Sequence, residues 1–189
     1  MSLDFSGYSD GQLAVFVLSG QRDAFAVLMR RHDEAIYRLI RSYVGDRQEA
    51  LDISQECFVS AFLALARFDC ERPFRVWLSR IALNKCRDWA RRRAVRRFLT
   101  FSISLSEEID TVADQGPSVE EAVASRQLFD HVAHAVADLP ATLKEPLILR
   151  TIEGFSQAET ATLLGITEKA VETRVRRARA RLLETLEKS

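Results

Sequence analysis

The chain has 189 residues, 47% of them hydrophobic, and its 27 basic and 27 acidic side chains leave no net charge. This composition is sufficient to bury one large core or two small ones, and it excludes a chain too polar to fold. The sequence has no run of roughly 18 apolar residues and lacks the features of a secretory signal. We therefore expect a cytoplasmic protein without direct membrane insertion.

Cysteine and histidine are sparse. The three cysteines are Cys57, Cys70 and Cys86, and the three histidines are His32, His131 and His134. The cysteines form neither a CxxC pair nor a Cys/His cluster, so we interpret them as interior thiols rather than disulfide or zinc ligands. The last two histidines lie three residues apart but lack a third ligand. The sequence predicts no metal, no cofactor and no catalytic residue.

Helical spacing of apolar residues dominates the first half of the chain. Ser9 and Gln12 have the spacing of a capping box and predict a short helix that ends near Gly20. Further helices are predicted from about residue 23 to 44, from about 47 to 67, and from Pro73 onward. In the third helix, an apolar stripe that includes Leu51 is expected to face the core. Together these helices predict a bundle domain over residues 1–97.

The helical pattern breaks after Arg97. Residues 98–126 are rich in Ser and acidic residues, contain a Gly-Pro pair, and predict a flexible linker. Their apolar first part, residues 98–105, either packs on the bundle, which we favour, or lies in a partner's groove. Helical spacing resumes in a second domain over residues 127–189. The predicted fold class is all-α, with two small helical domains.

The end of the chain has the pattern of a helix-turn-helix. Ser156 and Glu159 form a second capping box, Gly165 suits a left-handed turn, and Thr167 can cap the following helix. That helix has an apolar stripe and an opposite polar face, which carries Lys169, Glu172, Thr173, Arg176, Arg177 and Arg179. The pattern predicts a helix that enters the major groove of DNA. The alternative is a solvated basic helix within a bundle.

Charge is unevenly distributed along the chain. Residues 72–97 carry ten basic groups and one acidic group, and residues 169–181 carry six and one. Between them, residues 98–130 carry seven acidic groups and one basic group. Local clusters, not the total charge, govern phosphate binding. Tryptophans interleave the first basic block, where burial in the core and stacking on unpaired bases are both open interpretations.

Two separated blocks resemble one known family. RFDCERPFRVWLSRIALNKCRDWARRR resembles the second conserved region of bacterial sigma factors, and LPATLKEPLILRTIEGFSQAETATLLGITEKAVETRVRRARARL resembles their fourth region. QEALDISQECF is the most specific single motif. With a linker between the two regions, the chain is similar to the extracytoplasmic-function group of the sigma-70 family. This resemblance implies a non-enzymatic factor that recognises the −35 and −10 promoter elements and promotes strand opening.

The resemblance also assigns roles to individual residues. The helix with Asp52, Gln55 and Glu56 resembles the surface that docks on the clamp coiled coil of RNA polymerase. The proximal (−10) element is matched by the loop from Asp69 to Arg72 and by Phe68, Arg80, Asn84, Arg87, Arg91, Arg92 and Arg93. The distal (−35) element is matched by the polar face of the second helix of the helix-turn-helix. There Glu172 departs from relatives, which often carry Lys or Arg.

The partners implied by the resemblance are core RNA polymerase, promoter DNA and an anti-sigma factor, often membrane-tethered in this group. The residues alone leave an alternative, an autonomous helix-turn-helix regulator whose N-terminal bundle senses a ligand or dimerises. The QEALDISQECF helix and the first basic block favour the sigma factor, because a simple regulator needs neither. We expect the free protein to bind its promoter weakly, since the linker makes it costly to fix two small contact regions.

Overall fold

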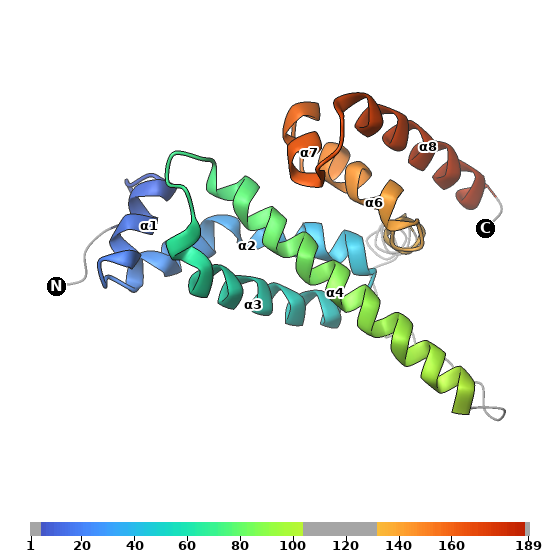
Figure 1. The fold of residues 1–189 in the computed structure, drawn as a ribbon, viewed down its shortest axis with the longest axis horizontal. Helices are drawn as coiled ribbons and strands as arrows, with labels where there is room; N and C mark the ends of the chain where they lie inside the picture. The colour runs from blue at the N-terminus through green and yellow to red at the C-terminus, as the bar shows by residue number, and fades with distance from the viewer. Residues whose placement is uncertain (1–4, 104–131, 188–189) are drawn as a thin grey trace, which may run out of the picture.

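The computed structural model describes residues 5–103 and 132–187, and within these ranges it is helical without strands (Figure 1). The first domain consists of α1 (Asp10–Leu18), α2 (Asp23–Val44), α3 (Arg47–Ala64), η1 (Leu65–Arg67) and α4 (Phe74–Ile103). Residues 132–137 are helical, and the second domain continues with α6 (Ala141–Leu147), η2 (Ile148–Ile152), α7 (Gln157–Leu164) and α8 (Glu168–Leu186). The predicted all-α class with two helical domains is confirmed. Residues 104–131, which include most of the predicted linker, lie outside the described residues.

The ends of the first helices follow the local signals in the sequence. At α1, Ser9 Oγ accepts a hydrogen bond from the Gln12 amide at 3.3 Å, and Gln12 Oε1 accepts one from the Ser9 amide at 2.9 Å. Gly45 ends α2 in the left-handed region with a φ of 81°. One residue later, the Asp46 carboxylate accepts a hydrogen bond from the Glu49 amide at 2.8 Å and starts α3. The predicted capping box is therefore confirmed, and Gly45 ends the helix that the sequence predicts to about residue 44.

The core of the first domain lies between α2, α3 and α4. Trp89 on α4 is buried, and its Nε1 donates a hydrogen bond to Glu49 Oε2 at 2.8 Å, which satisfies the indole inside the core. The core interpretation is confirmed for this tryptophan. Leu51, which was expected on the buried stripe of α3, is 47% exposed, so that expectation is wrong. Buried Ala50 and Ile53 flank it on the helix, so Leu51 lies on the outer face.

Helix α4 continues to Ile103, beyond Arg97 where the sequence predicted the end of the helical pattern. No Gly or Pro occurs between these two positions, and extending an existing helix costs far less than nucleating one. Phe98 is 71% exposed, so the expected packing of residues 98–105 on the bundle is wrong at this residue. The other side chains of that stretch lie outside the described residues.

The second domain packs against α2 and α4 of the first (Figure 1), with η2 against α2 and α7 against α4. A Cβ added to Gly45 would lie 2.8 Å from the Cβ of Ala137, so the two backbones approach closely there. Lys144 on α6 donates a hydrogen bond to the Tyr43 carbonyl at 3.0 Å, and its Nζ lies 4.5 Å from the centroid of the Tyr43 ring. We call this packing of the two domains the closed arrangement.

Candidate nucleic-acid interface

Helices α7 and α8 form the predicted helix-turn-helix. Ser156 Oγ accepts a hydrogen bond from the Glu159 amide at 3.1 Å, and the Glu159 carboxylate accepts one from the Ser156 amide at 2.8 Å. The interactions of the Glu159 carboxylate with the side chain and the backbone amide of Ser156 hold its pKa below its usual range. Gly165 turns the chain with a φ of 65°, and Thr167 Oγ1 accepts a hydrogen bond from the Ala170 amide at 3.2 Å. The turn and both caps are confirmed.

Helix α8 turns an apolar stripe inward and a basic face outward. Val171 and Ala178 are buried in the stripe. The exposed residues of the predicted DNA-reading set are Lys169, Glu172, Arg176, Arg177 and Arg179. Thr173 is half-buried, and its hydroxyl donates to the Lys169 carbonyl at 2.9 Å. Within the described part of the chain, the three arginines of this set have no ion-pair partner, so their guanidinium groups are available to phosphates and guanine edges.

The loop before α4 is held by an aromatic cluster. The ring centroids of Phe74 and Trp77 each lie 5.2 Å from that of Phe68. Phe68 is buried, so in this arrangement it supports the loop rather than presenting its ring to solvent. The loop from Asp69 to Arg72 is exposed except for Cys70, which is half-buried. The loop therefore presents polar groups and backbone on a rigid base.

The predicted proximal residues on α4 divide into two groups. One group is exposed near the end of the bundle and consists of Arg91, Arg92 and Arg93. In the other group, Arg80 Nη2 donates to the Thr162 carbonyl of α7 at 3.3 Å. Arg87 also contacts the second domain, and its Nη1 donates to Asn84 Oδ1 at 3.3 Å. The closed arrangement thus brings two of the predicted proximal residues, Arg80 and Arg87, against the helix-turn-helix domain.

Arg87 forms a bidentate pair with Glu145 of α6. Its Nε and Nη2 donate to the two carboxylate oxygens at 2.8 Å and 2.6 Å, respectively. The Glu145 side chain is 9% exposed, and its hydrogen bonds with Arg87 raise the pKa of that guanidinium. A fork-to-carboxylate pair of this kind is short, directional and charge-assisted. It occupies the same donors that Arg87 would offer to a phosphate.

Glu153 is a second buried carboxylate at the contact between the domains, with a side chain 2% exposed. Arg38 Nε donates to its Oε1 at 3.1 Å, and Arg75 Nη2 donates to its Oε2 at 3.2 Å. Arg75 also donates to the Glu153 carbonyl, and its guanidinium lies 4.5 Å from the centroid of the Phe155 ring. Two arginines of the first domain thus compensate the desolvation of one carboxylate of the second.

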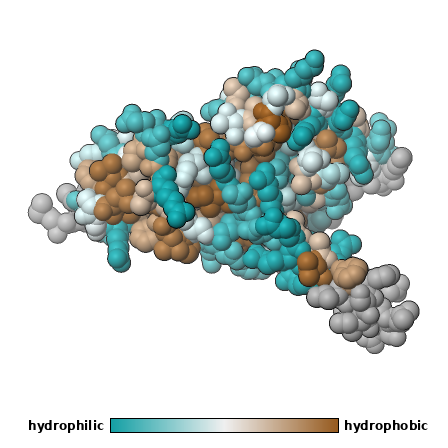
Figure 2. Space-filling model, viewed as in Figure 1, coloured by the Kyte–Doolittle hydropathy of each residue, from teal (hydrophilic) through white to brown (hydrophobic). Residues whose placement is uncertain are grey.

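The outer face of α3 carries the predicted polymerase-docking residues. Asp52, Gln55 and Glu56 are all exposed. Val59 and Leu63 continue the same face along the helix, and Leu63 is 77% exposed. Figure 2 shows apolar patches over α1 and α3, whereas the visible side of α4 is mostly hydrophilic until its projecting end, where Val95 and Phe98 are exposed. A face that combines acidic groups with exposed leucine and valine is suited to a partner helix with apolar and basic side chains.

Sequence reasoning did not identify the residues of the closed arrangement, namely Arg38, Arg75, Lys144, Glu145 and Glu153. One signal was present. Glu145 and Glu153 flank the apolar run PLILRTI, and acidic residues beside buried positions require partners. Their arginine partners lie 58 to 115 residues earlier in the chain, which sequence spacing does not reveal. Burial also lowers the pKa of Lys144.

The interior-thiol interpretation is confirmed for Cys57 and Cys86, which are buried, while Cys70 is half-buried. Burial raises the pKa of the Cys57 thiol to about 12. In the described ranges, no group of three or more His, Cys, Asp or Glu side chains is placed to hold a metal ion. His131 lies outside the described residues. None of the helices described for residues 5–103 and 132–187 is both long and apolar enough to span a membrane.

Comparison with known proteins bears directly on these surfaces. Sigma-70 region 2 matches residues 28–96, and sigma-70 region 4 matches residues 130–182. RNA polymerase sigma factor CnrH of Cupriavidus metallidurans is 41% identical over 95% of this chain and 95% of its own length. The chain belongs to the extracytoplasmic-function sigma factors of the sigma-70 family. A further relative is SigW of Bacillus subtilis, 32% identical over 90% of this chain and 92% of SigW.

Solved structures agree with this family assignment. The structure of CnrH in complex with the cytosolic domain of CnrY has a TM-score of 0.70 and 34% identity, and the match covers 95% of this chain and 98% of CnrH. The sigma factor RpoE of Bartonella quintana, solved with the anti-sigma factor NepR, shares the fold at a TM-score of 0.66 and 23% identity, over 86% of this chain and 96% of RpoE. As an alternative sigma factor, the protein binds RNA polymerase and confers promoter recognition. The autonomous regulator considered from the sequence is not favoured.

Proposed function

We propose that this sigma factor uses three separate surfaces in initiation. The outer face of α3 holds core polymerase, α4 and the loop before it contact the proximal element, and α8 reads the distal element. The chemistry of each surface supports this assignment: the outer face of α3, Arg91 to Arg93 of α4 and the basic face of α8 are exposed, and each carries groups that suit its partner. Since bacterial polymerase is cytoplasmic, we place the protein in the cytoplasm.

The contact between Arg87 and Glu145 carries a second part of the proposal. Arg87 cannot donate both to this carboxylate and to a promoter phosphate, and Arg80 is engaged with α7 on the same side of α4. We infer that the free protein is closed over part of its proximal surface and that docking on polymerase separates the two domains. This adds a second reason for weak promoter binding by the free protein, because the open state must first be populated.

When the domains separate, arginines of the first domain exchange carboxylate partners for phosphates. When the domains separate, the Glu145 and Glu153 carboxylates return to water, which removes their desolvation penalty. The arginines of the first domain then find phosphates, which accept the same forked hydrogen bonds as carboxylates. Because the charges are exchanged rather than lost, the closed and open states can lie within a few kcal/mol of each other, a gap that polymerase binding can overcome.

Reconstituted transcription tests the assignment of surfaces. The promoter is first mapped from transcript starts after overexpression, and purified protein is then added to core polymerase. Asp52→Ala, Gln55→Ala and Glu56→Ala together should weaken binding to core polymerase by about tenfold or more. Substitution of the exposed Glu34 on α2 serves as the control and should leave the affinity for core polymerase unchanged. If the triple variant binds core polymerase normally, the docking face lies elsewhere.

We also infer an anti-sigma partner. The relative CnrH occurs in a complex with the cytosolic domain of CnrY. A domain named in this way supports a partner whose remaining part lies outside the cytosol, hence a membrane tether. A protein that co-purifies with the tagged full chain from membranes should inhibit transcription when it is added back to the reconstituted system. If no co-purifying protein inhibits, this inference is wrong.

A further inference from the structure

Helix α1 touches the loop before α4 at a position where only glycine fits. A Cβ added to Gly11 would lie 2.6 Å from the carbonyl oxygen of Cys70 and 3.5 Å from its carbonyl carbon. Gly11 does not have a positive φ, so packing rather than backbone conformation requires glycine there. The atom it would meet is backbone, which cannot rotate away as a side chain could. The first turn of α1 therefore sets how closely the loop approaches the bundle.

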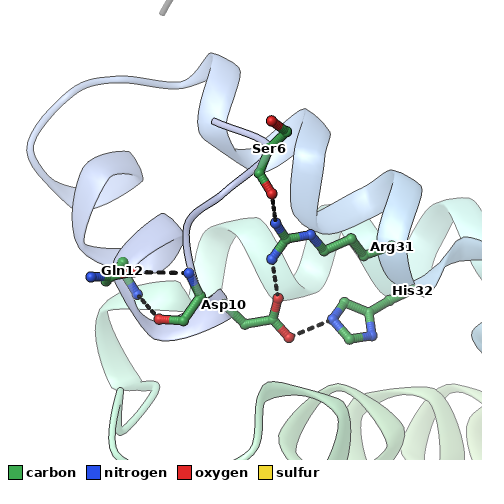
Figure 3. A network of polar contacts seen from close by, with 6 residues as sticks. Ser6, Asp10, Gln12, Arg31 and His32 are labelled. Carbon is green, nitrogen blue, oxygen red and sulfur yellow. Dashed lines mark hydrogen bonds and ion pairs between the residues drawn. The ribbon is translucent and has the colours of Figure 1, made fainter. Parts of the chain in front are cut away.

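A polar network fixes the position of α1 on α2 (Figure 3). The Asp10 carboxylate accepts a hydrogen bond from Arg31 Nη1 at 3.0 Å and lies 2.8 Å from His32 Nε2. Arg31 also donates to the carbonyl of Ser6 at 2.7 Å, so one guanidinium group joins the chain before α1 to the first turn of the helix. The interaction with His32, followed by that with Arg31, lowers the pKa of Asp10. The helix is thus anchored beside the residue that contacts the loop.

The same network reaches the far end of the loop. The His32 ring centroid lies 5.2 Å from that of Phe74, the first residue of α4. Phe74 in turn contacts Phe68, which precedes the loop. Within the loop, the Asp69 carboxylate accepts hydrogen bonds from the Glu71 amide at 3.1 Å and from the Arg72 side chain. Phe68 and Phe74 at the two ends of the loop are therefore linked through His32 to Asp10 on α1, and the bonds of Asp69 fix the conformation of the loop itself.

A cleft of about 380 Å³ separates the remaining part of α1 from the loop. Gly11, Gln12 and Phe16 line one side of it, and Cys70 and Glu71 line the other. A loop bordered by a cleft lacks lateral packing there, so the contact at Gly11 and the two ends determine where it lies. A change in that single contact is expected to move the exposed loop without disturbing the core.

We propose that α1 is a positioning element for promoter recognition, in which Gly11 sets the height of the 69–72 loop against the proximal element and Asp10 holds Gly11 in place. This inference rests on the proposed role of the loop. Neither Gly11 nor Asp10 touches DNA in this account. Both act through the Cys70 backbone, so their substitution alters base discrimination at the proximal element and leaves the distal element unaffected.

The experiment compares Gly11→Ala with Gly7→Ala as a matched control. A Cβ at Gly7 would meet nothing within 4 Å. Each full-length variant is assembled with core polymerase, and transcription is measured on the mapped promoter and on single-base variants of each element. Gly11→Ala should lower the preference for the native proximal element about tenfold, since misplacing a contact by a fraction of an ångström is sufficient for such a loss. Discrimination at the distal element and affinity for core polymerase should stay within about twofold.

Ratios between promoters separate a positioning role from a general loss of folded protein, because a smaller active fraction lowers transcription from all promoters equally. Asp10→Asn provides a second variant that adds no bulk, and it should shift the same ratio in the same direction. If Gly11→Ala and Asp10→Asn leave the proximal ratio unchanged while Glu71→Ala or Arg72→Ala alters it, the positioning role is overturned and the role of the loop stands. If the loop variants are also silent, the proposed role of the loop fails, and the positioning role fails with it.

Discussion

The two basic helices, α4 and α8, differ in what surrounds their arginines. On α8, Arg176, Arg177 and Arg179 face solvent beside a buried apolar stripe. On α4, Arg87 is held by the Glu145 carboxylate, and Arg80 donates to the backbone of α7. Both helices carry a similar density of basic residues in the sequence. In the closed arrangement the basic face of α8 is exposed, whereas α4 is partly covered by the second domain, to which α8 belongs.

This difference shows that a charge cluster indicates what a surface can bind but not when it is available. In the proposed assignment, the distal surface on α8 is exposed as the domain folds. The proximal surface is partly covered because Arg87 pairs with Glu145, and Glu153 stabilises the same closed arrangement through Arg38 and Arg75. This implies an order of events: the distal surface on α8 is exposed from the start, and the proximal surface on α4 binds DNA only after the domains separate.

The largest effect is expected at α8. Arg176→Ala should reduce transcription from a promoter with the native distal element by about 10- to 100-fold, because a bidentate contact to a base contributes roughly 1–3 kcal/mol. Promoters that initiate without a distal element should be unaffected. Arg181→Ala, on a later turn of the same exposed helix, serves as the control and should cost a few-fold on all promoters alike. An equal loss on every promoter for Arg176→Ala would instead indicate a phosphate or folding role.

The next effect concerns α4. Glu145→Gln replaces the charged partner of Arg87 with a neutral amide, which weakens the closed arrangement by about 1–2 kcal/mol. The free variant should therefore bind a forked DNA with an unpaired proximal element about 5- to 30-fold more tightly, up to the limit set by the closed fraction. Its affinity for duplex distal element should not change. Glu184→Gln on the exposed face of α8 is the matched control, and an equal gain there would mean that removal of negative charge alone explains the result.

A smaller effect is expected on stability and tests whether the N-cap residue Thr167 stabilises α8. Thr167→Ala removes the hydroxyl that accepts a hydrogen bond from the Ala170 amide at the start of α8. Stability should fall by about 1 kcal/mol, which lowers the melting temperature by about 2–4 °C for a chain of this size. Thr185→Ala, which removes a hydroxyl that donates to the Arg181 carbonyl near the end of the same helix instead of capping its start, should lower it by less. A cap that contributes nothing would leave the two variants equally stable.

The smallest effect is a pH dependence of the second domain. The folded pKa of Glu159 is lowered by its bonds with Ser156 from an ordinary value of 4.5. The carboxylate therefore stabilises the fold fully above pH 4.5 and loses this contribution as the pH falls through the lowered pKa. Denaturant unfolding should show wild type more stable than Glu159→Ala at pH 7, with the difference disappearing at low pH. A difference that persists below the lowered pKa would contradict the charged cap.

Much of the fold followed from local signals in the sequence. The capping boxes, the turn at Gly165 and the apolar stripe of α8 all depend on residues within a few positions of one another. The position of Leu51 did not follow, because tertiary packing decided it, and the length of α4 did not follow, because no Gly or Pro ends the helix after Arg97. An apolar residue on a helix with several apolar faces can lie outside, and a helix without a terminating residue continues into a predicted linker.

The sequence predicted which residues belong to each candidate surface, but not which of them are covered by the other domain or buried in the core. Nothing near Arg87 in the sequence identifies Glu145 as its partner, since 58 residues separate them. The buried position of Phe68 was also beyond spacing arguments, because it depends on Phe74 and Trp77 converging on it after the loop. Ion pairs between the domains depend on the whole fold. The only indication of them in the sequence was that Glu145 and Glu153 flank an apolar run.

The most direct test of the closed arrangement is a distance distribution between spin labels on the two domains. Labels placed at Gln48→Cys and Glu184→Cys, both exposed sites, can be used with Cys70→Ser, since Cys57 and Cys86 are buried. The free protein should give one narrow distribution, which Glu145→Gln with Glu153→Gln broadens, and core polymerase should shift it to longer distances. The same distribution with and without polymerase, or a broad one in the free protein, would contradict a domain closure that controls the proximal surface.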